Sequence, residues 1–365
     1  MNKTRTRFAP SPTGYMHIGN LRTALFEFLI AKHEGGDFLL RIEDTDQERK
    51  VEGAVDVIYK TLKECGLNWD EGPDIGGDFG PYVQSERLPM YKGYAEDLIK
   101  LGGAHYCFCS EEEIEAQRKE AESLGISFKF NDPCKHLSAE EVQAKLDAGE
   151  PYVIRQTIKN VGETYFDDEV YGRIEVDGDV LDEQILIKSD GYPTYNFANI
   201  IDDHQMQISH VVRGNEYLSS TPKYNLIYDA YGWQRPTYVH VPPVMKDEHH
   251  KLSKRNGDAS FQDLVAKGYL PDAIMNYIAL LGWAPETEQE IYTLDELIKV
   301  FNIHRISKSP AIFDIDKLTW MNGVYLRNMD EETYYETVRP YLEKAVHGPY
   351  NLKEIAKIIQ PRIDI

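Results

Sequence analysis

The stretch RFAPSPTGYMHIGN, residues 7–20, places a rigid polar segment directly before an apolar helix. Its two prolines fix φ and push the preceding residues toward extended backbone, while Gly14 permits a sharp turn. Residues 21–33 then carry apolar side chains at helical spacing. We expect Asn20 or a nearby residue to cap this helix, whose first amide groups and dipole attract anions. The stretch therefore predicts a phosphate site; a stiff turn around a buried His17 is the alternative.

The segments that follow alternate between strand and helix patterns. The strand FLLRIED comes after Gly35-Gly36, and helices are predicted at about 48–65 and 86–101. Residues 105–184 change to an acidic helix with β-prone pieces, which indicates an insertion, before the α/β pattern returns. The predicted domains are a catalytic α/β domain in two halves (1–104 and 185–258), an inserted subdomain (105–184), a helical domain (259–326) and the start of a second helical domain (327–365).

Composition and charge limit the functional classes. With 365 residues, 42% of them hydrophobic, the chain is long enough for two or three domains with cores of their own. Forty basic and 61 acidic residues give a net charge of −21, which excludes a protein that coats nucleic acid through bulk charge but allows local basic patches. The first residues, MNKTRTRF, precede no apolar run, and no segment approaches about 18 consecutive apolar residues. We therefore expect a cytoplasmic protein without a membrane span.

A second polar loop, KLSKR at residues 251–255, is followed by Asn-Gly. Lys251 and Lys254 can converge on a polyphosphate, where ammonium groups neutralise the charge that builds on an α-phosphate and on departing pyrophosphate. A basic run is also typical of an ordinary solvated surface. Its combination with the histidine loop at residues 7–20 favours the polyphosphate interpretation.

Three of the four cysteines lie close to a histidine in a C-x-C and C-x-H pattern. Cys107, Cys109, Cys134 and His136 together offer three thiolates and an imidazole, which fit a closed tetrahedral zinc site. Such a site can organise a subdomain with a modest core. The alternative is a set of small buried cysteines beside a surface histidine.

Seven motifs, in order and spacing, resemble bacterial glutamyl-tRNA synthetases, which are class I aminoacyl-tRNA synthetases. They are RFAPSPTGYMHIGN, LLRIEDTD, GPYVQSERLPMY, KSDGYPTYNFANIIDDH, HVVRGNEYLSSTP, KLSKR and FDIDKLTWMNGVYL. HIGN and KLSKR match the two class signatures, with Asn20 where the first usually has its second histidine. The resemblance covers residues 5–365 and implies a Rossmann-type parallel-sheet α/β catalytic domain, an inserted α+β zinc-bearing acceptor-binding subdomain and an all-α region that stops early in the anticodon-binding domain.

The resemblance assigns roles in ATP binding and catalysis. The helix end that carries His17, Gly19 and Asn20 holds ATP in the family, in agreement with the anion-site argument. Asn20 can donate a hydrogen bond to phosphate but carries no charge. The predicted catalytic residues are His17, Lys251 and Lys254. The predicted ATP-binding residues are Thr13, Gly14, His17, Gly19, Asn20, Glu216, Tyr217 and Lys254.

The amino acid pocket of the family needs cations for carboxylates and an anion for an ammonium group. Arg7 and Arg213 match the positions that face the substrate's carboxylates, because a guanidinium can grip a carboxylate at two points. Glu43 suits the α-ammonium group. The predicted glutamate-binding residues are Arg7, Ala9, Ser11, Glu43, Tyr195, Asn199 and Arg213. An ordinary structural ion pair is the alternative for each residue taken singly.

The resemblance implies a glutamate–tRNA ligase that activates L-glutamate with ATP and Mg²⁺ and acylates the 3′-terminal adenosine of tRNA-Glu, with activation that requires bound tRNA. A structural Zn²⁺ and a monomeric state are expected. Three alternatives remain open: a glutamyl-queuosine tRNA synthetase, a glutaminyl-tRNA synthetase, and, in a different class, a silent tRNA-binding paralogue or an unrelated nucleotidyltransferase. The helical segments after residue 327 and the run of matched motifs argue against them.

Overall fold

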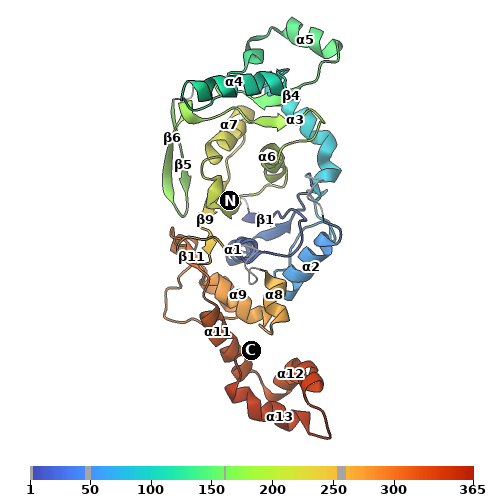
Figure 1. The fold of residues 1–365 in the computed structure, drawn as a ribbon, viewed down its shortest axis with the longest axis vertical. Helices are drawn as coiled ribbons and strands as arrows, with labels where there is room; N and C mark the ends of the chain where they lie inside the picture. Colours follow the sequence, from blue (N-terminus) through green and yellow to red (C-terminus); the bar gives the residue numbers. More distant parts are fainter. Residues whose placement is uncertain (1–2, 46–50, 160–161, 253–259) are drawn as a thin grey trace. The chain divides into compact units, whose positions relative to one another are not determined.

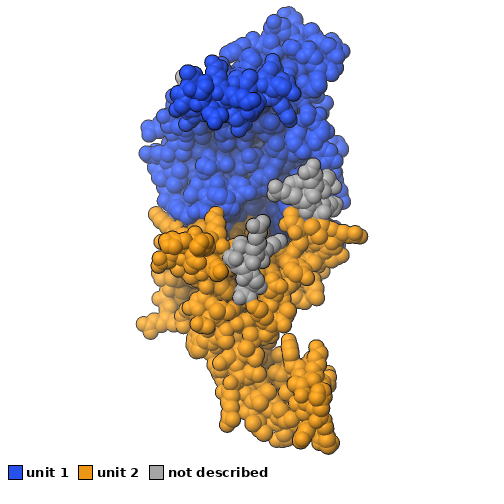
Figure 2. Space-filling model, viewed as in Figure 1, with its two compact units in different colours: residues 1–12, 36–50, 69–240 blue, residues 13–35, 51–68, 241–365 orange. Residues whose placement is uncertain are grey.

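The computed structural model describes residues 3–45, 51–159, 162–252 and 260–365. The chain passes repeatedly between two compact units, which Figure 2 colours separately. Unit 1 comprises Met1–Pro12, Gly36–Lys50 and Trp69–His240, and unit 2 comprises Thr13–Gly35, Val51–Asn68 and Val241–Ile365. The finer division into catalytic, acceptor-binding and helical domains stays a prediction. Within the described ranges, no helix is long and apolar enough to cross a bilayer.

The centre of unit 1 is built from short buried strands. Strands β1 (Arg5–Phe8) and β2 (Asp37–Leu40) pair in parallel, with Arg5 opposite Asp37 and Phe8 opposite Leu40. Strand β8 (His210–Gly214) contacts β1, and the amide of Ser209 donates to the carbonyl of Arg5 over 3.0 Å. Strand β9 (Thr237–Val241) belongs to the same sheet as β8. Parallel strands separated by a helix are what the sequence pattern predicted.

Helices α3 (Leu88–Lys100), α6 (Tyr195–Gln205) and α7 (Thr221–Tyr231) share one apolar core in unit 1 (Figure 1). Tyr91, Phe197, Tyr224 and Ile227 are all buried in it. Burying side chains of this size stabilises the fold by roughly 1.5–3 kcal/mol each. Helix α6 matters for the site because it carries three buried polar residues on the face opposite solvent: Asn199, Asp202 and Asp203.

The segment predicted as an insertion, residues 105–184, contributes strands β3 (Ala104–Cys107) and β4 (Val153–Gln156) and helices α4 (Glu111–Ser123) and α5 (Ala139–Asp147). The two strands form an antiparallel sheet with β7 (Ile185–Ile187), which lies just after the predicted boundary. Both helices begin at a serine whose hydroxyl accepts from the third amide while a glutamate returns the bond. A hairpin of β5 (Glu163–Asp168) and β6 (Gly172–Asp177) runs beside β9, where Asp168 is opposite Tyr238.

The described residues of unit 2 form mainly helices, together with a pair of two-residue strands, β10 (Val244–Met245) and β11 (Ala311–Ile312). Its helices are α1 (Ile18–His33), α2 (Ala54–Glu64), α8 (Phe261–Ala266), α9 (Pro271–Ala279), α10 (Leu294–Val300), α11 (Ile315–Asn328), α12 (Glu331–Ala345) and α13 (Leu352–Ile359). Helix α1 contacts α9 and α10, and Phe26 packs against Phe301 with ring centres 5.5 Å apart. The mainly helical end expected from the sequence is present.

Short 3₁₀ helices connect several of these elements. They are Gln84–Arg87, Pro133–His136, Gly178–Val180, Asn215–Tyr217, Ile303–Arg305 and Gln360–Arg362. One of them, Pro133–His136, follows an aspartate whose carboxylate accepts from the amide of Cys134. This turn positions one of the predicted metal ligands.

Candidate active site

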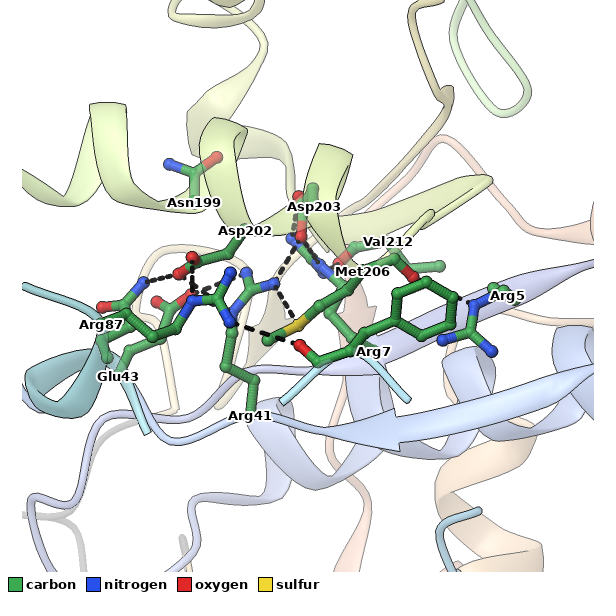
Figure 3. Close-up of polar contacts among 12 residues, drawn as sticks. Arg5, Arg7, Arg41, Glu43, Arg87, Asn199, Asp202, Asp203, Met206 and Val212 are labelled. Carbon is green, nitrogen blue, oxygen red and sulfur yellow. Dashed lines mark hydrogen bonds and ion pairs between the residues drawn. The ribbon is translucent and has the colours of Figure 1, made fainter. Parts of the chain in front are cut away.

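Arg7, at the end of β1, is held by a carboxylate of α6. Its Nε donates to Asp203 Oδ1 over 2.8 Å and its Nη2 donates to Asp203 Oδ2 over 3.2 Å, as Figure 3 shows. Arg41 Nη1 donates to the same Oδ1 over 2.8 Å. All three side chains are buried. One carboxylate therefore joins the ends of two neighbouring strands to a helix.

Arg41 also holds the predicted ammonium-binding residue. Its Nη2 donates to Glu43 Oε1 over 2.9 Å. The neighbouring Asp202 accepts from Arg87 Nε over 2.7 Å and from the hydroxyl of Tyr91. Three guanidinium groups, on residues 7, 41 and 87, thus face three carboxylates, on residues 43, 202 and 203. The network is balanced in charge before any substrate enters.

The two carboxylates that accept hydrogen bonds from Arg41, those of Glu43 and Asp203, differ in their pKa. Burial raises the pKa of Asp203, but the charges and hydrogen bonds of Arg7 and Arg41 outweigh burial, so this pKa lies below its ordinary value. For Glu43, burial dominates over Arg41 and Arg7 and raises the pKa to about 7. Glu43 therefore titrates near neutral pH, and a cation placed beside it would favour the charged form.

Arg213, the last but one residue of β8, is buried and has neutral partners. Its Nε donates to His240 Nε2 over 3.1 Å and its Nη2 donates to the hydroxyl of Thr221 over 2.8 Å. The rings of Tyr217, Tyr224 and Tyr238 surround its Cζ at 5.3, 4.8 and 5.4 Å. Within the described ranges, Arg213 forms no ion pair. It is a desolvated cation ready for an anionic ligand.

The other residues predicted to bind glutamate also belong to unit 1. Tyr195 and Asn199 lie on α6. Asn199 comes about one helical turn before Asp202 and Asp203, and Tyr195 comes about two turns before them. Asn199 shares its helix face with Asp202 and Asp203 by the three- and four-residue spacing, and its amide donates to the carbonyl of Tyr195 over 2.6 Å. Ala9 is half-buried and Ser11 is exposed. The ring of Tyr195 lies 5.6 Å from that of Tyr217.

The start of α1 in unit 2 differs from the sequence expectation. The helix begins at Ile18 and is capped by His17, whose Nδ1 accepts from the amide of Gly19 over 3.1 Å, and Asn20 lies inside the first turn. His17 Nε2 lies 3.0 Å from the carbonyl of Leu252, which fixes it as a donor. A Cβ at Gly19 would approach His17 Nδ1 to 3.2 Å. Glycine there leaves the capping imidazole in place.

The remaining predicted ATP-binding and catalytic residues are divided between the units. Thr13 is exposed and Gly14 has φ +111°, a conformation that glycine adopts without strain. Lys251 is exposed and its backbone bridges to Met245. Glu216 and Tyr217 follow β8 in unit 1 as a 3₁₀ turn. Lys254 lies outside the described residues.

Three of the four predicted metal ligands come together in the insertion. The ligand atoms of Cys107, Cys109, Cys134 and Asp132 lie within 4.8 Å of one another, and the sulfurs of Cys109 and Cys134 are 3.6 Å apart. A tetrahedral zinc ion with Zn–S bonds of about 2.3 Å needs sulfurs about 3.8 Å apart. His136 is exposed and outside this group, so its role stays a prediction.

Sequence reasoning missed Asp132, Arg41, Asp202 and Asp203. Asp132 has a local signal, because an aspartate directly before a proline commonly caps the turn that follows, here next to Cys134. The adjacent acids of NIIDDH interrupt the apolar face of α6, which indicates buried partners. Nothing local identifies those partners, since Arg41 lies 162 residues away from Asp203 in the chain.

Comparison with known proteins gives the family. A model described as tRNA synthetases class I (E and Q), catalytic domain, matches residues 3–320. The chain is 60% identical over 364 residues to Glutamate--tRNA ligase of Clostridium tetani (strain Massachusetts / E88) and covers 75% of that relative. Among solved structures, a glutamate tRNA ligase from Elizabethkingia meningosepticum CCUG26117, in complex with its amino acid, has a TM-score of 0.93 at 37% identity, over 100% of this chain and 78% of that one.

A second solved structure, Glutamate-tRNA Synthetase from Elizabethkingia anophelis, also has a TM-score of 0.93, at 38% identity over 79% of its chain. The chain therefore belongs to the class I tRNA synthetases of the glutamate and glutamine group. Within that group, the relatives and neighbours given above are glutamate–tRNA ligases, which confirms the resemblance read from the seven motifs and the predicted α/β catalytic fold.

Proposed function

We propose that the chain is a glutamate–tRNA ligase. The α-carboxylate of L-glutamate attacks the α-phosphorus of ATP, the new C–O–P linkage forms glutamyl-AMP, and pyrophosphate leaves. A ribose hydroxyl of the 3′-terminal adenosine of tRNA-Glu then attacks the acyl carbon, and AMP leaves. The identity of 60% over the full chain to a protein of that name, together with the family match, supports this reaction. ATP is expected as its Mg²⁺ complex.

The charge distribution of unit 1 supports glutamate as the amino acid substrate. Arg213 is a buried guanidinium without an ion pair in the described chain, and Glu43 is a buried carboxylate whose pKa is raised to about 7 by burial, in spite of the charges of Arg41 and Arg7. A substrate that places a carboxylate beside Arg213 and an ammonium group beside Glu43 would give each of these residues an ion-pair partner. Arg7 donates from a position fixed by Asp203. Glutamate has the groups that this arrangement lacks, whereas glutamine has no side-chain charge.

The ATP-binding roles rest on the start of α1 and on the loop that contains KLSKR. The dipole at the start of α1 favours phosphate beside Gly19 and Asn20, where the amide of Gly19 now donates to His17 Nδ1. His17 would have to exchange its bond to the Leu252 carbonyl for one to a phosphate oxygen. Lys251 and Lys254 would neutralise charge on the α-phosphate and on pyrophosphate, with Lys254 as the contact to the transition state.

The thiol group of the insertion fits a structural zinc ion. Three thiols would form the donor set, with the sulfurs of Cys109 and Cys134 close to tetrahedral spacing, and His136 or Asp132 would supply the fourth ligand. Burial raises the pKa of Cys107 to about 11, so the metal-free thiol is protonated at neutral pH and a metal must displace that proton. When bound, the ion would tie β3 to the turn before α5. We propose no part for it in catalysis.

The alternatives make different predictions for one assay. ATP–pyrophosphate exchange is measured with glutamate or glutamine, each with and without tRNA-Glu. A glutamate–tRNA ligase is expected to exchange with glutamate, and by the family trait only when tRNA is present. Exchange with glutamine alone would indicate a glutaminyl-tRNA synthetase, and no exchange under any condition would indicate a silent paralogue. A monomeric state and a cytoplasmic location belong to the same proposal.

A further inference from the structure

The contacts of Arg213 raise the question of why this buried cation has neutral partners. Its Nε bonds to His240 Nε2 and its Nη2 bonds to Thr221 Oγ1. The hydroxyl of Thr221 lies 2.9 Å from the carbonyl of Tyr217 and 3.2 Å from His240 Nε2, and it accepts from Arg213 because a guanidinium has only donors. Both acceptors are fully buried and neither carries a negative charge. These partners orient the guanidinium of Arg213 but do not neutralise its charge.

Asp168 determines the protonation of His240. Its Oδ2 lies 2.6 Å from His240 Nδ1 and accepts the backbone amide of His240 over 3.0 Å, while its Oδ1 accepts from the amides of Val170 and Tyr171. A carboxylate has only acceptors, so the imidazole proton lies on Nδ1. A guanidinium has only donors, so Nε2 must be the lone-pair side. The two neighbours require one neutral tautomer.

Electrostatics agree with this tautomer. Burial lowers the pKa of His240, the bond to Asp168 opposes that effect, and the charge of Arg213 lowers the pKa further. The ring of Tyr238 lies 6.0 Å from that of His240, with 30° between the ring planes, and this packing restricts rotation of the imidazole. The imidazole of His240 therefore separates the carboxylate of Asp168 from Arg213. Direct contact would cancel the charge of the cation, as Asp203 does for Arg7.

We propose that His240 is a positioning residue, which Asp168 locks as a neutral acceptor so that Arg213 is oriented with its charge uncompensated and selects a substrate that carries an additional carboxylate. This inference rests on the proposed function. Thr221 is the second neutral acceptor in the same role. Specificity for glutamate over glutamine then depends on what the partners of Arg213 lack, namely a negative charge, as much as on Arg213 itself.

A matched pair of variants at Thr221 tests the charge argument. Thr221→Asp places a carboxylate within reach of Arg213 Nη2, at the first turn of α7 where an anion is favoured. Thr221→Asn has the same shape without the charge. In tRNA-dependent ATP–pyrophosphate exchange, we expect the aspartate variant to raise the KM for glutamate about 100-fold and to reduce the ratio of kcat/KM for glutamate over glutamine similarly, with kcat changed less. The asparagine variant is expected to stay within about fivefold.

Variants of His240 and Asp168 test the positioning role. His240→Gln retains a neutral acceptor near the Nε2 position and is expected to keep the KM within about fivefold. Asp168→Asn lets the amide donate to Nδ1, which moves the imidazole proton to Nε2 against the donors of Arg213, and is expected to raise the KM about tenfold. Nitrogen-15 NMR of labelled histidine, assigned through the His240→Gln spectrum, should show Nδ1 protonated in the wild type and Nε2 protonated in Asp168→Asn.

Several outcomes overturn the assignment. They are equal KM values for the two Thr221 variants, an imidazolium or an Nε2–H tautomer of His240 in the wild type at neutral pH, or a wild-type spectrum in Asp168→Asn. If circular dichroism shows that Thr221→Asp does not fold, the KM values of the His240 and Asp168 variants and the NMR spectra test the assignment instead. His33→Gln, an exposed histidine of α1, is the control for the labelling and kinetics. Absence of glutamate-dependent exchange in the wild type refutes the proposed function, whereas the NMR result still decides the His240 assignment.

Discussion

Replacing Asp203 with asparagine should be among the most destabilising single changes in unit 1. This carboxylate accepts two hydrogen bonds from Arg7 and one from Arg41, and its side chain is 2% exposed. At an effective dielectric constant of about 20, one ion pair at 2.8 Å amounts to about 6 kcal/mol before the cost of desolvation is subtracted. Removal of one partner from a buried pair leaves uncompensated charge and costs about 3–5 kcal/mol. We expect a loss of that size.

The measurement is urea denaturation of Asp203→Asn, followed by circular dichroism at neutral pH, with the KM for glutamate measured on the folded protein. Asp229→Asn is the control, because Asp229 forms a similar two-point pair with Arg235 in an exposed position. An exposed pair contributes about 1 kcal/mol or less. Equal losses of stability in the two variants would refute the claim that burial of the network determines its energy.

The same carboxylate gives the variant a distinct pH dependence. The pKa of Asp203 is lower in the folded chain than its ordinary value of 3.8, so its contribution to stability is present above pH 3.8 and is lost as the pH falls through the folded-state pKa. The wild type should therefore lose more of its unfolding free energy than Asp203→Asn does when the pH is lowered into that range. Parallel pH profiles for the two proteins would contradict the assigned pKa direction.

The remaining predictions concern three separate sites. Because the pKa of Glu43 is about 7, its ionised fraction falls about tenfold from pH 8 to pH 6, so the KM for glutamate in aminoacylation should rise by a similar factor; a flat profile would contradict a role in binding the ammonium group. Protein purified without chelator should contain about one zinc ion per chain by elemental analysis and Cys134→Ser should lose it, whereas a wild-type content below about 0.2 would refute the metal site. Lys254→Ala should slow pyrophosphate exchange by about 10²–10³ without weakening tRNA binding, and an unchanged rate would remove this lysine from the mechanism.

Local sequence signals predicted the elements well where caps and periodicity agree. The acidic helix that follows Ser110 has a capping box and appears as α4, and the apolar pattern before the double glycine appears as α1. The start of α1 was missed by three residues because histidine is outside the usual set of N-caps, which favours Ser, Thr, Asp and Asn. Its capping depends on a tertiary contact, the bond from His17 Nε2 to the Leu252 carbonyl.

The candidate site was predictable in residue identity and much less in its partners. A resemblance in motifs identifies Arg7 and Arg213 but does not reveal that one faces a carboxylate and the other an imidazole. Those partners, Asp203 and His240, come from segments 196 and 27 residues away: Asp203 lies on helix α6, and His240 lies on β9, the neighbour of β8 in its sheet. Charge compensation depends on tertiary contacts, so it cannot be predicted from sequence periodicity.

In the proposed function, the two arginines are therefore expected to contribute differently to recognition of a dicarboxylic amino acid. Arg7 has its charge largely compensated by Asp203, so an incoming carboxylate gains direction from its fixed donors and little net Coulomb energy. Among the described residues, the hydrogen-bond partners of Arg213 are neutral acceptors and aromatic faces lie around it, so we expect it to supply net attraction in a desolvated setting. Lysine at position 7 would lose the geometry that Asp203 sets, and lysine at position 213 would keep the charge but lose the bond that aims it. We therefore expect Arg7 to orient the substrate and Arg213 to attract it, and each role depends on a partner residue, Asp203 or His240.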